Sequence, residues 1–87
     1  MASFLVETYM PSASGLNDVE VRLARAANEL SVEGSNVRLV RSIYVAEDEI
    51  CFHLFDATSA DAVKKASAQA LVHPQRVVET IETLGKL

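Results

Sequence analysis

Four residues carry side chains that could do chemistry together if the fold places them on one surface. Glu7 supplies a carboxylate, Cys51 a thiol, His53 an imidazole and Tyr44 a phenol. A carboxylate beside an imidazole raises the imidazole pKa and orients the ring, so Glu7, His53 and Tyr44 are candidate acid–base residues. Carboxylate, thiolate and imidazole also form a donor set for zinc or nickel, so Glu7, Cys51 and His53 are candidate metal ligands. Both interpretations require that the elements carrying these residues be neighbours.

Each of the four residues lies in a segment with the pattern of a β-strand. Residues 3–10 alternate between two faces until Pro11, and residues 37–46 and 49–56 are β-rich runs on either side of Glu47-Asp48. Two such runs around a short polar turn predict an antiparallel hairpin. The register that keeps its apolar residues together pairs Val45 with Ile50, Ile43 with Phe52, Tyr44 with Cys51, Ser42 with His53 and Val40 with Phe55.

Two helices and a last strand complete the pattern. Asn17 followed three positions later by Glu20 predicts a capping box at the start of the first helix, and Gly34 predicts its end. Residues 58–72 predict the second helix, with Thr58 and Asp61 as a capping pair. After Pro74, residues 75–84 predict an edge strand whose inward face the pattern leaves unassigned.

The element order βαββαβ predicts the fold class and the neighbours of each strand. It indicates a ferredoxin-like α+β sandwich, in which one antiparallel four-stranded sheet carries both helices on one face. We expect residues 1–87 to form a single domain of this kind, without repeats or linkers. The first strand then lies beside the third, which brings Glu7 near Cys51 or His53.

The face of the sheet without helices is therefore the predicted site. Its expected residues are Leu5, Glu7, Tyr9, Val40, Ser42, Tyr44, Cys51, His53 and Phe55. Apolar and aromatic side chains around a few polar groups are typical of a subunit interface or a ligand pocket. A domain of 87 residues buries a smaller fraction of its surface on folding than a larger domain does, so covering this face in a homodimer, as a dimeric α/β barrel, would add the missing apolar burial. In a purely structural interface, His53 would bond Ser42 or Glu7 and Cys51 would simply pack.

Composition narrows the classes of partner. The net charge of −4 and the dispersed Lys and Arg residues argue against nucleic acid, which needs a concentrated basic patch. The single Cys51 fits a buried, reduced thiol in the cytoplasm. We expect neither a signal peptide nor a membrane span, because residues 1–3 lead directly into a strand pattern and no long apolar run follows.

Several functions of this fold lack their sequence features. The third strand, residues 49–56, has acidic ends and no glycine, unlike the basic-Gly-aromatic run of an RNA-recognition sheet. Paired cysteines of a soft-metal chaperone do not follow the first strand, where residues 10–15 read Met-Pro-Ser-Ala-Ser-Gly. Glycine-rich phosphate loops are also missing from the sequence.

Short motifs over nearly the whole chain resemble a family of small bacterial ferredoxin-like proteins of largely unknown function that includes a nickel-binding protein. The matching segments are residues 4–7 with Pro11, residues 37–45 with Arg41-Ser42, Glu47-Asp48, Cys51, residues 56–62, and Pro74 with Arg76-Val77. The resemblance implies that Glu7 and Cys51 occupy family positions. Two departures concern the metal: Ala66 and Ser67 stand where many members have a histidine, and Leu39 or Val40 where many have a tryptophan.

Three functions remain open on these residues. The first is a cytoplasmic homodimer that binds a small ligand or a nickel or zinc ion in a cavity on the open sheet face. The second is a small cofactor-free isomerase, cyclase or monooxygenase that uses Glu7, His53 and Tyr44. The third is a purely structural dimeric accessory domain, because the fold itself specifies no function.

Overall fold

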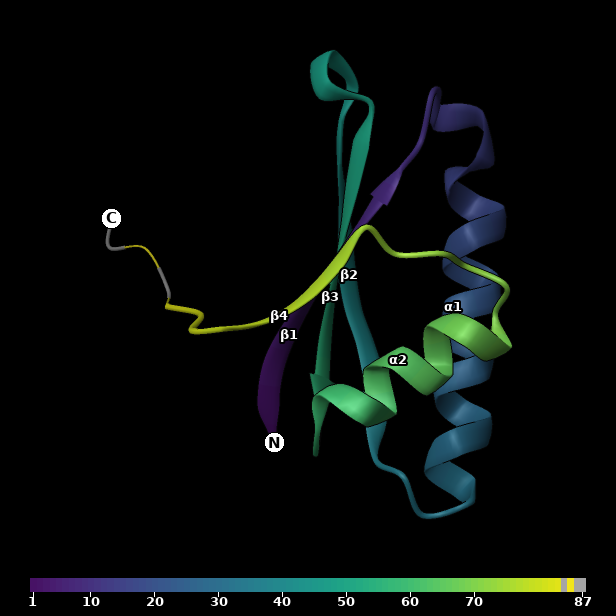
Figure 1. The fold of residues 1–87 in the computed structure, drawn as a ribbon, viewed down its shortest axis with the longest axis vertical. Helices are drawn as coiled ribbons and strands as arrows, with labels where there is room; N and C mark the ends of the chain where they lie inside the picture. The colour runs from purple at the N-terminus through teal and green to yellow at the C-terminus, as the bar shows by residue number, and fades with distance from the viewer. Residues whose placement is uncertain (84, 86–87) are drawn as a thin grey trace.

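The computed structural model describes residues 1–83 and 85 and confirms the ferredoxin-like βαββαβ arrangement. The sheet has four antiparallel strands in the order β2-β3-β1-β4, and both helices lie on the same side of it (Figure 1). In chain order the elements are β1 (Ala2–Tyr9), the short 3-10 turn η1 (Ala13–Gly15), α1 (Leu16–Val32), β2 (Val37–Val45), the turn η2 (Ala46–Asp48), β3 (Ile50–Ala57), α2 (Ala60–Gln69) and β4 (Arg76–Thr80). The predicted last strand extended to Leu84, which lies outside the described residues.

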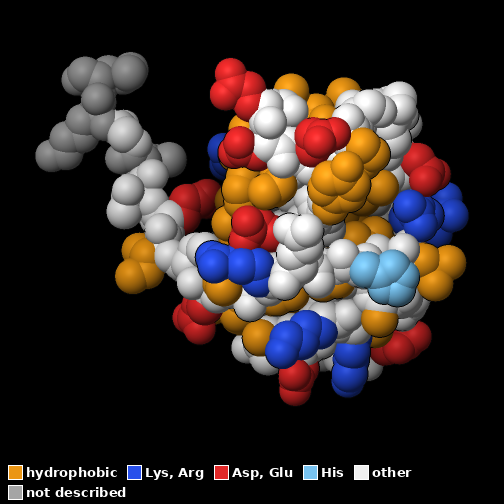
Figure 2. Space-filling view, turned by 45° about the horizontal axis from the view of Figure 1, so that its top comes forward, with side chains coloured by type: hydrophobic (Ala, Val, Ile, Leu, Met, Phe, Trp, Pro, Cys, Tyr) orange, Lys and Arg blue, Asp and Glu red, His pale blue; other side chains and the backbone are white. Residues whose placement is uncertain are grey.

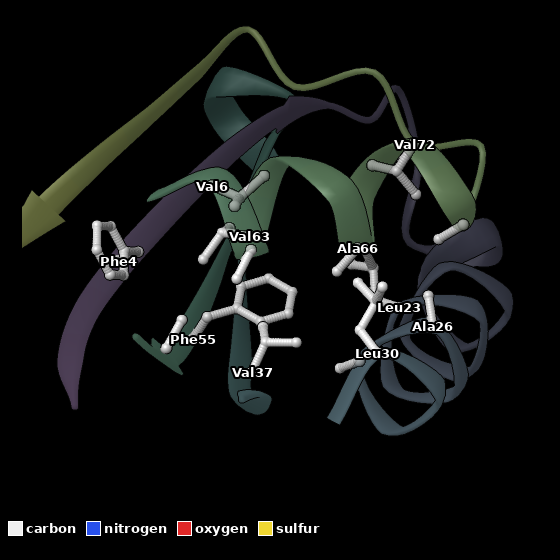
Figure 3. Close-up of a cluster of buried hydrophobic side chains, with 14 residues drawn as sticks. Phe4, Val6, Leu23, Ala26, Leu30, Val37, Phe55, Val63, Ala66 and Val72 are labelled. Carbon is white, nitrogen blue, oxygen red and sulfur yellow. The ribbon is translucent and has the colours of Figure 1, made fainter. Parts of the chain in front are cut away.

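The core lies between the sheet and the two helices. In Figure 3, the side chains of Val37 and Phe55 lie near Val63 of α2, while Phe4 of the same cluster lies beside β1, further from the helices. The helices contribute mainly small residues: the buried positions are Leu23, Ala26, Ala27 and Leu30 on α1 and Ala62, Val63, Ala66 and Ser67 on α2. Small side chains allow the helices to lie close to the sheet, so the core is well packed although most of its large side chains come from the sheet.

The predicted assignment of faces is wrong for the hairpin. Cys51, His53 and Phe55 are completely buried under the helices, where they pair with the inward residues of β1. Both faces of β3 are largely apolar, with Ile50, Phe52 and Leu54 on the other side, so alternation alone did not say which face is covered. Because side chains alternate along a strand, a prediction that turns His53 toward the open face assigns every residue of β3 to the wrong side of the sheet.

A β-bulge in β2 explains the remaining difference. The pairs Val45–Ile50, Tyr44–Cys51, Ile43–Phe52 and Ser42–His53 agree with the prediction, but Leu39, not Val40, lies opposite Phe55. The register shifts between Leu39 and Arg41, so Val40 is an extra residue in this strand. Because of that residue, the inward side chains are at odd-numbered positions before the bulge (Val37 and Leu39) and at even-numbered positions after it (Ser42 and Tyr44).

The helix starts differ from the predicted caps. Helix α1 begins after Gly15, which makes no side-chain capping bond, and Ser12 instead caps the preceding 3-10 turn. Helix α2 is capped by Ser59, whose hydroxyl accepts a hydrogen bond from the Ala62 N–H at 3.2 Å. The predicted capping box and the Thr58 cap are therefore wrong, because neighbouring hydroxyl or glycine residues occupy the cap positions one or two places earlier or later.

Both helices end in the same Schellman motif, but only one has glycine at its left-handed position. After α1 this position is Gly34, with φ 102°. After α2 it is Leu71, with φ 58°, and the Val72 N–H donates to the Ser67 carbonyl at 2.9 Å as the motif requires. Leu71 is 73% exposed, so its side chain gains little burial in return for the strained backbone.

Leu71→Gly is therefore expected to raise the free energy of unfolding by about 0.5–1 kcal/mol, because glycine adopts the left-handed conformation without steric cost. Urea unfolding monitored by circular dichroism measures the change. Gly34→Ala, at the equivalent position after α1, is the matched comparison and is expected to lose stability. A loss of stability in both variants would contradict the interpretation of Leu71 as strained.

No helix within the described part of the chain is both long and apolar enough to cross a membrane.

Candidate functional site

Glu7 lies on the uncovered face of the sheet, away from the other predicted site residues. On β1 it is directly opposite Phe52 of β3 and Arg76 of β4. Its carboxylate forms an ion pair with Arg76, and its side chain is only 18% exposed. Its intended partner His53 is opposite Val6, one residue along β1, and therefore on the opposite face. The predicted pairing of Glu7 with His53 is wrong for this reason.

His53 is the centre of a buried polar cluster under the helices, which we define as Thr8, Ser42, Cys51 and His53. The Nδ1 atom of His53 is 2.7 Å from the Ser42 hydroxyl and 3.9 Å from the Cys51 sulfur. The Nε2 atom is 3.2 Å from the Thr8 hydroxyl, which also lies 3.4 Å from the Cys51 carbonyl. Of the two partners expected for His53 in a purely structural interface, Ser42 or Glu7, the structure has Ser42, but on the covered face of the sheet.

One tautomer of neutral His53 satisfies both of its ring nitrogens and the hydroxyls of Thr8 and Ser42. The Nε2–H donates to the Thr8 oxygen, and the Thr8 hydroxyl donates to the carbonyl of Cys51. The Ser42 hydroxyl donates to Nδ1, which is unprotonated in this tautomer. Because no donor or acceptor of the ring is left without a partner, burial of this imidazole carries little penalty as long as it remains neutral.

Burial also sets the charge of the two titrating groups. It lowers the pKa of His53, and the negative charge of Glu20 opposes that shift without reversing it. Burial raises the pKa of the Cys51 thiol, and Glu20 adds to the rise. The thiol is therefore protonated at neutral pH, which makes it a poor nucleophile and a poor metal ligand in this conformation.

Tyr44, the third candidate acid–base residue, contacts neither Glu7 nor His53 through its hydroxyl but bonds to the backbone. It lies opposite Cys51 on β2, and its hydroxyl donates to the Met10 carbonyl at 3.0 Å. This bond holds the tip of the hairpin against the end of β1, where the Met10 N–H donates to the Glu49 carbonyl at 2.8 Å. The phenol thus has a structural role at this end of the sheet.

The candidate metal ligands are divided between the faces. Cys51 and His53 belong to the buried polar cluster, while Glu7 is on the other side of the sheet. Among residues 1–83 and 85, no three His, Cys, Asp or Glu side chains come together in a way that could hold a metal ion. The predicted three-residue metal set is therefore not assembled in this conformation.

A hollow of about 230 Å³ lies next to the buried polar cluster, at the end of the sheet where β1 leads toward α1. Thr8 belongs to both, because its side chain also lines the hollow. The other lining residues are Tyr9, Met10, Val19, Arg22, Leu71, Val72 and His73. This wall combines apolar side chains with a guanidinium, an imidazole and a hydroxyl, which is the usual make-up of a small-molecule pocket.

Two residues that contact the candidate site residues were missed in the sequence: Thr8, which contacts His53, and Arg76, which pairs with Glu7. Thr8 follows Phe4 and Val6 on the inward face of β1, and a hydroxyl at such a position signals a buried hydrogen-bond partner. Arg76 opens β4, and only the strand register shows that it reaches Glu7. The first signal was readable from the alternation, whereas the second depended on the tertiary pairing.

Comparison with known proteins bears on the fold. Among solved structures, the protein SCO4226 from Streptomyces coelicolor A3(2) is similar to this chain, with a TM-score of 0.73 and 16% sequence identity over 95% of this chain and 100% of that chain. No family model matches the sequence, and no curated protein matches it. At 16% identity the similarity shows the fold alone. The chain therefore has the ferredoxin-like fold of that Streptomyces protein, and its resemblance to a family with a nickel-binding member stays a prediction.

Proposed function

We propose that the chain is a small cytoplasmic homodimeric binding protein, in which two uncovered sheet faces pack together and enclose a chamber for an organic ligand. The observation that carries the proposal is the apolar character of this face. Its apolar residues, which come from all four strands, are Leu5, Ile43, Val45, Ile50, Phe52, Leu54 and Val78. Patches of this kind are typical of interfaces and ligand grooves.

The size of the face fits a second copy of the chain. Four strands at a spacing of about 4.8 Å and roughly eight residues of about 3.3 Å each cover roughly 500 Å². Two copies would therefore bury on the order of 1,000 Å², which is about the smallest area expected of a specific interface. This area is that of the flat outline of the sheet alone, so side chains that project from the sheet add to the buried area.

The charges on the face also suit self-association. Three ion pairs lie on or beside it: Glu7 with Arg76, Asp56 with Arg38 at 2.8 Å, and Glu82 with Arg41 at 3.8 Å. Equal numbers of acids and bases leave no net repulsion between two copies, and a two-fold interface requires a self-complementary surface of this kind. A partner with a strongly charged surface is disfavoured, because the three acids on or beside this face are paired with three bases and leave no excess of either sign.

Glu7 and Arg76 give the proposed chamber a polar anchor. The pair lies among the apolar side chains of β1, β3 and β4, and the Arg76 side chain is 63% exposed, so a ligand can reach it. Covering the face would remove water from the pair and strengthen its hydrogen bonds to a ligand group. The chamber would then offer a mainly apolar wall with one orienting pair.

Ile43→Glu is expected to convert the dimer to a folded monomer, because Ile43 is 55% exposed on the uncovered face and a charge there opposes burial. Sedimentation velocity measures the change. Val21→Glu is the matched control, since Val21 is 46% exposed on α1 and faces away from the proposed interface. A wild-type chain that stays monomeric at high concentration, or a dimer that survives Ile43→Glu, would contradict the proposal.

A further inference from the structure

We infer that the hollow between β1, α1 and the segment after α2 binds a small carboxylate with an apolar body, independently of the proposed chamber on the other face. The hollow has a volume of about 230 Å³, equivalent to roughly eight water molecules at about 30 Å³ each. It lies on the helix side of the sheet, so a second copy on the uncovered face would leave it open. Figure 2 shows an imidazole at the surface with hydrophobic side chains beside it.

The polar groups of the hollow favour an anion. Its one permanent charge is the guanidinium of Arg22, and no Asp or Glu is among its described lining residues. His73 adds a further group that can donate a hydrogen bond, whereas the Thr8 hydroxyl already donates to the Cys51 carbonyl. In a chain with a net charge of −4, a concave site lined by donors and by one cation is a selective place for a carboxylate.

Arg22 is held in place and keeps donor capacity. Its Nη1 donates to the Ala70 carbonyl at 2.9 Å, which ties α1 to the end of α2. Its Nε lies 3.1 Å from an Asp18 oxygen, yet this buried N–H has no properly aligned hydrogen-bond acceptor among the described residues. The Asp18 side chain is 74% exposed and can swing into solvent. A ligand carboxylate can therefore take over the position of Asp18 on an already oriented guanidinium.

Apolar contacts would hold the body of the ligand. Met10, which follows β1, and Val72, which follows α2, are buried and line the hollow, while Val19 is half-buried on α1. Leu71 stands at the rim in the left-handed conformation that glycine would adopt without strain. A strained, exposed leucine has a use if its side chain covers a bound ligand.

Benzoate and its neutral analogue benzyl alcohol are suitable probes, titrated into the full chain and followed by amide chemical shifts. We expect benzoate to bind about tenfold more tightly, the difference attributable to one charge-assisted hydrogen bond. Shifts should concentrate at Thr8, Val19 and Val72, and leave Leu5 and Phe52 on the uncovered face unchanged. Equal affinities, or shifts centred on the uncovered face, would overturn the assignment.

Four variants test the individual contacts. Arg22→Gln should lose about tenfold in benzoate affinity, whereas Arg25→Gln, one turn further along α1 and outside the lining, should keep it. Asp18→Asn should bind benzoate more tightly, because it removes the competing carboxylate. Leu71→Gly should weaken binding although it stabilises the fold, so a loss of affinity in this variant does not come from unfolding. Unchanged affinity in both Arg22→Gln and Leu71→Gly would refute the proposed site.

Discussion

Phe55→Ala is expected to lower the free energy of unfolding by about 3–5 kcal/mol, the largest effect of any single truncation in this core. Phe55 is completely buried and is the largest of the fully buried side chains. Removing its ring leaves a cavity between the sheet and α2, where the surrounding small residues have little volume with which to refill it. A domain of this size has a total stability of only about 4–13 kcal/mol, so the variant should be close to unfolding.

Phe52→Ala is the matched comparison, because Phe52 lies three residues earlier on β3 but on the uncovered face. At low protein concentration, where no second copy covers this face, the variant should lose less than half as much stability as Phe55→Ala. Urea titration gives both values, and Phe55→Leu provides a milder change if the alanine variant does not fold. A larger loss for Phe52→Ala would restore the assignment of faces that the sequence pattern favoured.

The second large effect is a loss of stability in mild acid caused by His53. Burial lowers the pKa of this imidazole in the folded chain, so the unfolded chain binds the proton first as the pH falls. Stability from this residue is complete above the ordinary histidine pKa of about 6.5. Below that value it decreases by up to about 1.4 kcal/mol per pH unit, until the folded chain also takes up the proton at its lower pKa.

His53→Gln is the variant that isolates this contribution, because the amide does not titrate and can still meet the hydroxyls of Ser42 and Thr8. Between pH 7.5 and 5, the wild type should lose up to about 2 kcal/mol more than this variant. His73→Gln, which removes the exposed second histidine, should retain the wild-type slope. Parallel curves for wild type and His53→Gln would mean that His53 is not kept neutral by its burial.

The fold was predictable because several independent patterns agreed. The alternation in β1, the hairpin pattern around the polar turn at Glu47-Asp48 and the helical segments on either side of the hairpin all indicated the same βαββαβ order. Four of the five predicted pairs of the hairpin are present, since the position of the turn fixes the register near it. Gly34 also ends α1 as expected.

The site was not predictable in the same way, because its geometry depends on which face of β3 the helices cover. Phe52 and Phe55 are equivalent in a hydrophobic pattern, and keeping Ile43, Val45, Ile50 and Phe52 together as the apolar inward face turns His53 outward. The structure resolves the conflict with two hydroxyls, those of Ser42 and Thr8, which satisfy both ring nitrogens. Pairing of polar groups across three strands is a tertiary property that no single segment reveals.

The extra residue at Val40 has a consequence for comparing this chain with its relatives. It changes the parity of β2, so that odd positions face inward before it and even positions after it. A related strand without the bulge, aligned to this one residue by residue, would match Ser42 to a side chain on the opposite surface. The role of a residue in this strand can therefore be compared between two proteins only after the bulge has been located in both. Until then, an identical residue after Val40 in a sequence alignment does not show that the two side chains lie on the same face of the sheet.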